Sequence, residues 1–399
     1  MDYLELAKQE ENLLKELRHH IHNHPELSGQ EKETIAYIDG KLTEFQIDHV
    51  VVEDGGVLGF IRGGKPGKTL LMRADCDALP IDEEPVCHGY QRPCVSENPG
   101  VMHACGHDLH TANLLVAGKI LHEHRQELAG DILLFFERSE EKPGPYQKNL
   151  FRYIEEHKIA VDGSWGMHVR NGKGGVALFM PGPTGAGVFS FSFTIKGKGG
   201  HGSRPYVANN PIGCFQAIAA EMDRLRMNKL TPFSPVTLTI CSVHAGNAGN
   251  VIPETLTFAG NARYFDMKEV GEPMREEIIR LVHQTAQIHG CEVIKEDVSE
   301  PMNPSIVDEK SFHLAEAMFK ECFPAGSADT TRRQPSMGSE TFANIMAKWP
   351  GIMFSFGIAN AEKKIGGDIH QPDFDIDEDI MYLATAYAIG YADYFLKHA

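Results

Sequence analysis

The sequence predicts an α/β protein: a large domain with a mostly parallel sheet, interrupted by a small inserted domain of βαββαβ order. Between residues 49 and 169, short apolar segments that resemble strands alternate with amphipathic helical segments, which is the pattern of a largely parallel sheet. From residue 184 to residue 297 the order becomes strand, helix, strand, strand, helix, strand, which is typical of ferredoxin-like domains. The first pattern resumes near residue 300. We therefore expect a discontinuous large domain, 1–183 and 298–399, and an inserted domain, 184–297.

Local signals place the elements of the large domain. Apolar residues at helical spacing predict a helix over 3–22, which ends before Pro25 because a residue that precedes proline disfavours the helical conformation. Ser28 as an N-cap, with Glu31 as its capping-box partner, predicts the start of a second helix. The remaining expected elements are strands at 49–52, 57–61, 69–72, 131–136 and 163–169, helices at 111–124, 150–157, 309–322 and 377–397, and an apolar segment at 351–357.

The inserted domain begins after Pro181-Gly182-Pro183. Alternating apolar and polar residues predict a half-buried strand over Phe189–Lys196, which leads into a glycine-rich loop that carries His201. The other expected elements are helices at 211–226 and 271–289 and strands at 236–243, 255–265 and 291–297.

Composition limits the partners and the location that we expect. The chain has 38 basic and 55 acidic residues, a net charge of −17, which argues against nucleic acid and against anionic membranes as partners. No apolar run approaches the roughly 20 residues that a membrane helix needs, and the acidic N-terminus lacks the basic and apolar regions of a signal peptide. The eight cysteines are scattered, as free thiols in a reducing compartment are. We therefore expect a cytoplasmic protein.

One stretch, Met102–His110, concentrates a thiol, three imidazoles and a carboxylate. Cys105 and His107 are two residues apart, so both side chains can face one ion from an extended or looped backbone. This spacing differs from the Cys-x₂₋₄-Cys pairs of structural zinc sites, so a metal here would take its other ligands from distant parts of the chain, as open catalytic sites do. The alternative is a histidine-rich surface loop beside a buried free cysteine.

Other candidate ligands follow strands or lie in loops of the same domain: Glu141, His168 and His370. Open α/β sheets bind ligands at the carboxyl ends of their strands. Together with Cys105 and His107, these side chains suit a divalent transition metal such as Zn, Mn, Co or Ni rather than Mg or Ca. They exceed the ligands of one tetrahedral ion, so we expect two metal ions per subunit, with the thiolate able to bridge them.

Glu140 precedes the candidate ligand Glu141. At an irregular strand end both carboxylates can border one cavity, where one binds metal and the other takes a proton from water. The alternative is a solvated acidic turn that includes Lys142.

These residues belong to a larger set of motifs through which the chain resembles the M20 metallopeptidase family, in its amidohydrolase branch of aminoacylases, hippurate hydrolases and auxin-conjugate hydrolases. The motifs occur in the family's order over nearly the whole chain: His24–Ser28, Arg73–Ile81, Met102–His110, Glu140-Glu141, Gly166–Val169, Gly199–Ser203, Asn250–Pro253, Gly338–Glu340 and His370–Phe374.

The resemblance implies a role for each matching residue. Glu140 would be the general base, and His201, on the inserted domain, would donate a hydrogen bond to the oxyanion. Asn250 and Arg263 would bind the substrate carboxylate. Five side chains match the ligands of a dinuclear metal centre: Cys105, His107, Glu141, His168 and His370. Three carboxylates are candidates for orienting these ligands, with strand-end caps as the alternative: Asp75, Asp77 and Asp108. The inserted domain would serve as a lid and as the dimerisation domain of a homodimer.

Two positions depart from the family pattern. Glu137-Arg138-Ser139 stands where the family usually has Gln-Pro-Ala, and Leu109 stands where Gly is common. Arg138 would add a charge near Glu140, and we expect it to affect substrate choice or the pKa of Glu140. Neither change removes a ligand or the base.

The resemblance therefore implies a metal-dependent hydrolase that cleaves the amide bond of N-acyl amino acids or similar small conjugates. Two alternatives remain open. One is an exopeptidase or dipeptidase of the same family, and the other, from a different class, is a catalytically silent homologue that binds metal or ligand. The presence of Glu140 argues against the silent homologue, because such a protein needs ligands but no base.

Overall fold

The computed structural model describes residues 1–87 and 89–399. The chain divides into two compact units: unit 1 comprises Met1–Gly182, Val307–Arg333 and Lys348–Ala399, and unit 2 comprises Pro183–Ile306 and Gln334–Ala347. The segment Gln334–Ala347, which we expected in the large domain, thus packs within unit 2. Its side-chain contacts give the reason, because Ser339 accepts a hydrogen bond from Arg263 (3.0 Å) and Asn344 accepts one from Asn303 (3.0 Å).

Unit 1 contains most of the helices and the larger sheet. Its strands are β1 (Asp48–Val52), β2 (Gly56–Ile61), β3 (Lys65–Asp75), β4 (Val86–Cys87), β5 (Tyr90–Gln91), β6 (Ala129–Glu137), β7 (Gly163–Lys173), β8 (Ala177–Leu178), β17 (Ala328–Asp329) and β18 (Gly351–Ala359). Its helices are α1 (Tyr3–Gln9), α2 (Glu11–Asn23), α3 (Lys32–Glu44), α4 (His107–Glu123), α5 (Tyr146–Glu156), α8 (Glu309–Cys322) and α10 (Met381–His398). The single helix predicted over 3–22 is wrong, since Glu10 leaves the helical conformation and separates α1 from α2.

The sheet of unit 1 has eight strands in the order β1-β2-β6-β3-β7-β18-β8-β17. The central strands β6, β3, β7 and β18 run parallel to one another. Antiparallel pairing is confined to β1 with β2, β2 with β6, and β18 with β8 among the described strands of this sheet. The predicted α/β class with a mostly parallel sheet is confirmed.

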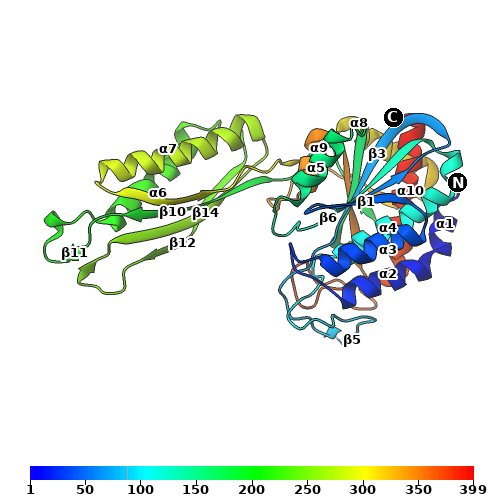
Figure 1. Ribbon diagram of the computed structural model, residues 1–399, viewed down its shortest axis with the longest axis horizontal. Coiled ribbons are helices and arrows are strands. Elements are labelled where there is room, and N and C mark those ends of the chain that lie inside the picture. The colour runs from blue at the N-terminus through cyan, green and yellow to red at the C-terminus, as the bar shows by residue number, and fades with distance from the viewer. Residues whose placement is uncertain (88) are drawn as a thin grey trace. The chain divides into compact units, whose positions relative to one another are not determined.

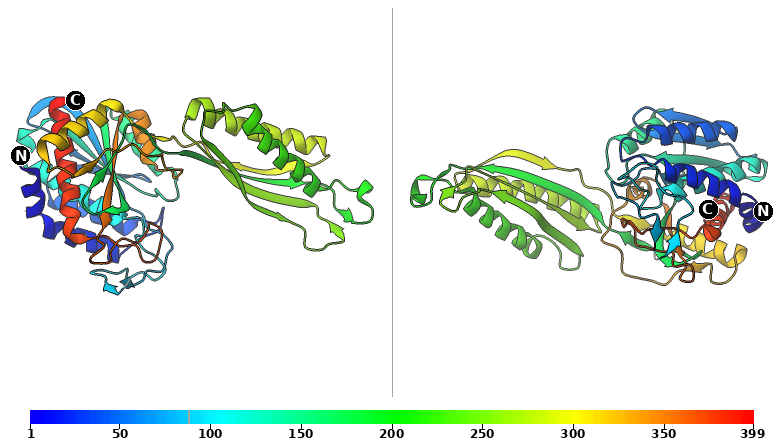
Figure 2. Two further views of the ribbon diagram at one scale, coloured as in Figure 1. Left: turned by 180° about the vertical axis from the view of Figure 1, so that it is seen from behind. Right: turned by 90° about the horizontal axis from the view of Figure 1, so that it is seen from below.

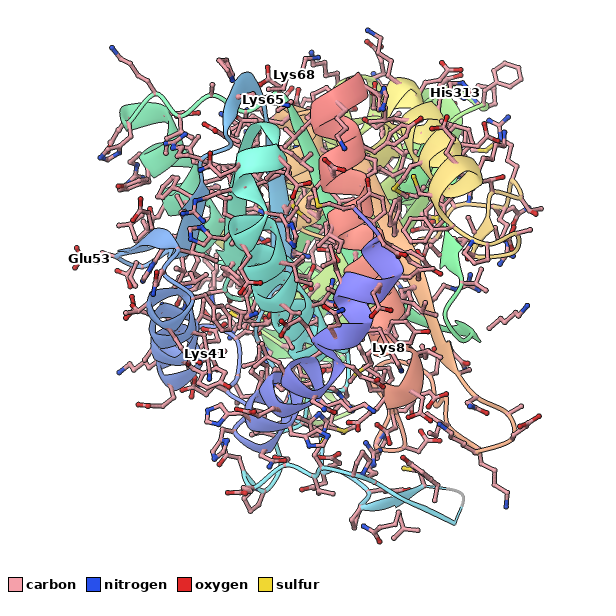
Figure 3. The ribbon with its side chains drawn as sticks, turned by 90° about the vertical axis from the view of Figure 1, so that its right-hand side faces the viewer. Lys8, Lys41, Glu53, Lys65, Lys68 and His313 are labelled. Carbon is pink, nitrogen blue, oxygen red and sulfur yellow. The ribbon has the colours of Figure 1, made fainter. Side chains whose placement is uncertain are left out.

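Burial follows from this position in the sheet. β3 is exposed over Lys65–Lys68 and buried from Thr69 to Asp75, as a central strand covered on both faces must be. Helices α4 and α10 pack against β3, and α4 is covered in turn by α2, so that it is buried along nearly its whole length (Figures 1 and 2). Charged side chains such as Glu53, Lys65 and Lys68 lie exposed at the periphery (Figure 3).

Unit 2 and its borders contain the remaining elements. The strands are β9 (Gly182–Gly185), β10 (Gly187–Lys196), β11 (Gly200–His201), β12 (Val236–Ala245), β13 (Val251–Ile252), β14 (Thr255–Tyr264), β15 (Glu292–Val298) and β16 (Ser305–Val307). The helices are α6 (Pro211–Asn228), α7 (Glu272–Ile288) and α9 (Phe342–Lys348).

The main sheet of unit 2 is antiparallel, with four strands in the order β12-β14-β10-β15. In chain order, β10, α6, β12, β14, α7 and β15 confirm the predicted βαββαβ module. Phe189, Phe191, Phe193 and Ile195 alternate along β10 and are buried with α6 and α7 in a hydrophobic core distinct from that of unit 1. Among the helices of residues 1–87 and 89–399, none combines the length and hydropathy of a membrane span.

Candidate metal centre

The candidate centre lies where parallel strands of unit 1 end. Asp75 ends β3, Glu137 ends β6, and His168 lies in β7. Asp75 pairs with Glu137 across the two strands, so the residues that follow both strands emerge side by side. This is the edge at which open α/β sheets bind ligands.

The loop that carries Cys105 turns into α4 at Gly106. Gly106 has a φ of +80°, and a Cβ atom at this position would lie 2.4 Å from Cγ2 of Val169. Only glycine fits both the backbone conformation and the space. The helix begins at His107 rather than at the predicted residue 111, so His107 and His110 lie in its first turn. The prediction that every ligand lies on a loop or strand end is therefore wrong for His107, and also for His168, which lies inside β7.

The structure brings all five predicted ligands together. Sγ of Cys105 lies 3.4 Å from Nε2 of His168 and 3.3 Å from Nε2 of His370. Oε1 of Glu141 lies 3.0 Å from Nε2 of His370 and 4.0 Å from Nε2 of His107. Cys105 and His107 are buried, which excludes the alternative of a histidine-rich surface loop. The thiol of Cys105 thus lies between His168 and His370.

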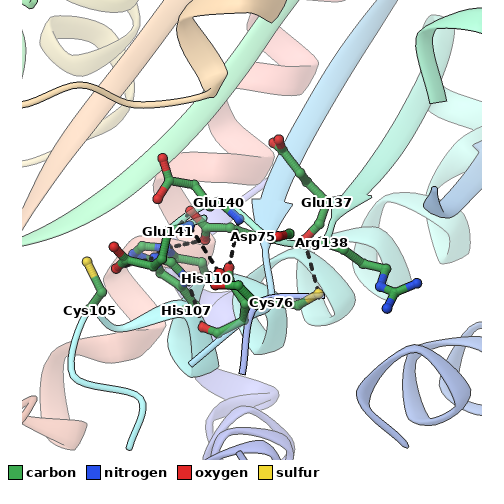
Figure 4. Close-up of polar contacts among 12 residues, drawn as sticks. Asp75, Cys76, Cys105, His107, His110, Glu137, Arg138, Glu140 and Glu141 are labelled. Carbon is green, nitrogen blue, oxygen red and sulfur yellow. Dashed lines mark hydrogen bonds and ion pairs between the residues drawn. The ribbon is translucent and has the colours of Figure 1, made fainter. Parts of the chain in front are cut away.

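Glu140 and Glu141 are held by their backbone rather than exposed as an acidic turn. Both N–H groups donate to the carboxylate of Asp77, that of Glu140 to Oδ1 (3.1 Å) and that of Glu141 to Oδ2 (3.0 Å). A carboxylate oxygen of Glu140 lies within 4.8 Å of donor atoms of His107 and Glu141. Figure 4 shows both carboxylates on the side of the turn where Cys105 and His107 lie. The alternative of a solvated acidic turn is therefore wrong.

Two of the three predicted orienting carboxylates contact the cluster. Asp77 faces Nδ1 of His107 through its carbonyl oxygen (2.9 Å) and Oδ1 (3.2 Å). Asp75 contacts Nδ1 of His110 (2.6 Å) and lies 3.5 Å from Nε2 of His107. Such partners fix the ring orientation of a ligating histidine. Asp108 instead pairs with Arg18 and His22 (2.9 and 2.8 Å), so its prediction as an orienting residue is wrong.

Sequence reasoning assigned no role to His110. Its Nε2 accepts a hydrogen bond from the backbone N–H of Val169 (3.0 Å), and its ring lies 4.8 Å from that of His168. His110 therefore links the start of α4 to the strand that carries His168. The three-residue spacing from His107, which places both on one face of a helix, was the available signal.

Electrostatics favour positive charge at the centre of the cluster. Burial raises the pKa of the Cys105 thiol well above its usual range. Burial opposes a charge on His107, but Asp75, Asp77 and Cys105 together outweigh it and raise the pKa of His107. The carboxylate of Glu141 raises the pKa of His370.

The donor set fits a divalent metal. Nε2 of His107 is shielded from solvent and has no hydrogen-bond partner within the described residues, although it faces Asp75 and Glu141. A buried polar atom without a partner is unfavourable, and coordination to a cation would satisfy it. A thiol, imidazoles and carboxylates together suit borderline transition metals.

Residues 71–393 match the model of Peptidase family M20/M25/M40. The chain belongs to this family. It is 32% identical to thermostable carboxypeptidase 1 of Saccharolobus solfataricus over 98% of both chains, and 31% identical to N-acetylcysteine deacetylase of Bacillus subtilis over 93% of both. Among solved structures, the YXEP protein of Bacillus subtilis, described as a dinuclear metal binding peptidase from the M20 family, is 28% identical with a TM-score of 0.78, covering 98% of this chain and 100% of that chain. The family resemblance is confirmed.

Within this M20 chain, the departure at Glu137-Arg138-Ser139 places Arg138 beside a buried carboxylate. Arg138 points away from Glu140 (Figure 4). Its Nε donates to Oε2 of Glu31 (3.0 Å), and its guanidinium lies 4.6 Å from the ring centroid of Tyr146. A buried carboxylate thus pairs with the guanidinium. The expected effect of Arg138 on substrate choice or on the pKa of Glu140 stays a prediction.

The remaining predicted residues of the M20 pattern lie in unit 2. His201 pairs with Val251 between β11 and β13, and the N–H of Gly202 donates to the carbonyl of Asn250 (2.8 Å), so His201 and Asn250 are close. The N–H of Ser203 donates to Nδ1 of His201 (3.1 Å), which leaves the ring proton on Nε2. Arg263 lies on β14 and donates to Ser339.

Proposed function

We propose that the protein is a metal-dependent amidohydrolase that cleaves the amide bond of N-acyl amino acids or similar small conjugates. The observation that carries this proposal is a second carboxylate, Glu140, beside a complete set of metal donors. A protein that only stores or senses metal needs the donors alone. N-acetylcysteine deacetylase, a relative along 93% of this chain, is named for the removal of an acyl group from an amino acid.

We assign the donors to two divalent ions per subunit, Zn, Mn, Co or Ni, held by Cys105, His107, Glu141, His168 and His370. When bound, the metal supplies Lewis acidity, which polarises the amide carbonyl and lowers the pKa of water. Glu140 receives the proton of the attacking water and passes it to the leaving nitrogen. Asp77 holds the backbone of Glu140 and keeps its carboxylate at the cluster.

Three residues of unit 2 complete the proposed machinery. His201 donates from Nε2 to the oxyanion, and the hydrogen bond that its Nδ1 accepts from Ser203 supports this tautomer. Asn250 and Arg263 bind the substrate carboxylate. Unit 2 would serve as a lid and as the contact surface of a homodimer, as the family resemblance implies. The protein would act in the cytoplasm.

The test compares the wild type with Glu140→Gln in metal content and in release of amine from a panel of N-acyl amino acids. We expect equal metal content and a loss of turnover of about 10²–10⁴-fold in the variant. Glu97→Gln, which alters an exposed carboxylate, is the matched control. Metal binding without turnover of any amide would favour the silent homologue, and the absence of metal from the wild type after incubation with Mn²⁺ or Zn²⁺ would overturn the proposal.

An exopeptidase is the second candidate, favoured by the 32% identity to a protein named carboxypeptidase. Substrate length separates the two. An amidohydrolase of the proposed kind cleaves N-acetyl amino acids at least as efficiently as peptides, whereas an exopeptidase needs a peptide and discriminates by its free terminus.

A further inference from the structure

The turn that presents Glu140 and Glu141 is held by two buried carboxylates. Three consecutive backbone N–H groups donate to them: Ser139 to Oε1 of Glu31 (2.8 Å), Glu140 to Oδ1 of Asp77 (3.1 Å) and Glu141 to Oδ2 of Asp77 (3.0 Å). Asp77 belongs to the cluster, because it also contacts His107. Glu31 comes from a different part of the chain, before α3, and the mechanism gives it no role.

Ser139 makes this turn dependent on its surroundings. Its φ is +62°, in the left-handed region that residues with a side chain rarely adopt. Such a conformation persists only where neighbouring groups over-determine it. Two contacts do so: the N–H donates to Glu31, and the hydroxyl donates to the carbonyl of Lys142 (2.6 Å). The residue directly before the proposed base is thus held on both sides.

Glu31 is built into this position. Its side chain is fully buried, and besides Ser139 it accepts hydrogen bonds from the N–H of Gly29 (2.9 Å) and from Nε of Arg138 (3.0 Å). The predicted capping box is wrong, because Ser28 donates to Asp77 (2.6 Å) and Glu31 turns toward Ser139.

Capping of α3 is provided by another residue. The first turn of the helix donates to Glu26, from the N–H of Lys32 (3.1 Å) and from the N–H of Thr34 (2.8 Å). The carboxylate of Glu31 is therefore not required at the helix terminus, and its donors all come from the two loops that meet at the turn.

We propose that Glu31 is a positioning residue for hydrolysis: through the N–H of Ser139 it fixes the turn from which Glu140 and Glu141 reach the cluster. This inference rests on the proposed function of the site. Arg138 forms an ion pair with Glu31 and also donates to the carbonyl of Gly29. Neither of these contacts is needed for the hydrogen bond from the N–H of Ser139 to Glu31. The chemistry should therefore depend on the acceptor oxygen of Glu31 and not on the ion pair.

The test uses Glu31→Leu, Glu31→Gln and the matched control Arg138→Gln, each saturated with Mn²⁺, with kcat and KM measured on a cleaved N-acyl amino acid. Glu31→Leu removes the acceptor, and we expect kcat to fall by about 10²-fold with KM nearly unchanged, since small displacements of a catalytic group have effects of this size. Glu31→Gln retains an acceptor oxygen and should restore most of the rate. Arg138→Gln should leave kcat close to that of the wild type.

If Glu31 only stabilised the fold, its variants would behave like a variant that is merely less stable, with unchanged kcat in the folded fraction. Leu42→Ala, which creates a cavity under the same helix without a polar contact to the turn, is the stability control and should leave kcat unchanged in the folded fraction. Should Glu31→Leu fail to fold, Glu31→Ala takes its place, because it also removes both carboxylate oxygens and its smaller side chain cannot clash with the groups around it.

The proposal is overturned if a folded, metal-loaded Glu31→Leu or Glu31→Ala turns over at the wild-type rate, or if Arg138→Gln reproduces the loss. Failure of the proposed function is distinguishable, because the wild type would then cleave no amide. In that case the affinity for Mn²⁺ serves as the readout: displacement of Glu141 weakens binding in Glu31→Leu but not in Arg138→Gln, and equal affinities contradict the positioning role.

Discussion

A buried histidine makes the stability of unit 1 depend on pH in a direction that can be measured. His22 is 1% exposed, with Nδ1 2.8 Å from Oδ2 of Asp108 and Nε2 2.9 Å from Oε1 of Glu83. Burial and the nearby charge of Arg18 oppose protonation, but the two carboxylates outweigh them and raise the pKa of His22 to about 9. The adjacent ring of His103 does not contribute a charge, because burial lowers the pKa of His103 to about 4.

The magnitude follows from the difference between the folded and unfolded states. Each pH unit between the ordinary pKa of 6.5 and about 9 corresponds to 1.36 kcal/mol, so protonated His22 contributes about 3 kcal/mol to the free energy of unfolding. Because the pKa is higher in the folded state, this contribution is complete below pH 6.5 and is lost as the pH rises through about 9. In His22→Gln, the side chain does not titrate, and its amide NH₂ can donate to only one of the two carboxylates.

The assay is urea unfolding at about pH 6 and about pH 9.5 in the presence of a chelator, so that metal binding does not add a pH dependence. Both tryptophans, Trp165 and Trp349, belong to unit 1, so tryptophan fluorescence reports on the unit that contains His22. We expect the wild type to lose about 3 kcal/mol more than His22→Gln between the two pH values. Equal losses in the two proteins would mean that His22 is neutral in the folded state, and the electrostatic reasoning would be refuted.

Two further predictions concern the site itself. Gly106→Ala should lower the free energy of unfolding of unit 1 by about 2–5 kcal/mol, because the alanine would take a left-handed backbone conformation and its Cβ would overlap with Val169. Adding Val169→Ala should recover the share of this loss that comes from the overlap. If urea unfolding of Gly106→Ala matched that of the wild type, the role of Gly106 would be contradicted. His201→Ala should lower kcat by about 10²–10³-fold without changing metal content, whereas unchanged turnover in a steady-state assay would remove His201 from the mechanism.

Part of the ligand cluster could be predicted from the sequence, because Glu141 follows a strand with a clear hydrophobic pattern and His168 lies in another. Parallel strands bring their carboxyl ends to one edge, so Glu141, after β6, and His168, in β7, had to lie near each other once the sheet was recognised. His370 could be placed only through the family motif. Its position depends on a backbone hydrogen bond from its N–H to the carbonyl of Ala104 (2.8 Å), which no local pattern encodes.

The supporting residues were predicted less well, and for a physical reason. Ser28 and Glu31 match a local capping pattern, yet both side chains bind partners far along the chain, Asp77 and Ser139. A side chain chooses between a nearby backbone N–H and a distant one according to tertiary structure, which a four-residue pattern does not contain. Arg138 is a similar case, because it lies two residues from Glu140 in sequence but forms an ion pair with the distant Glu31.

The order of elements in the sheet of unit 1 has a consequence for biosynthesis. β18 lies between β7 and β8, although unit 2 separates it from both in the chain. A nascent chain that has emerged as far as Ile306 holds every element of the βαββαβ module, but the larger sheet still lacks an interior strand. The strands of the module can therefore pair before β18 is made, whereas the larger sheet must close a long loop late, a step that is slow on entropic grounds. His370 emerges after β18, so the proposed set of metal donors is complete only late in assembly.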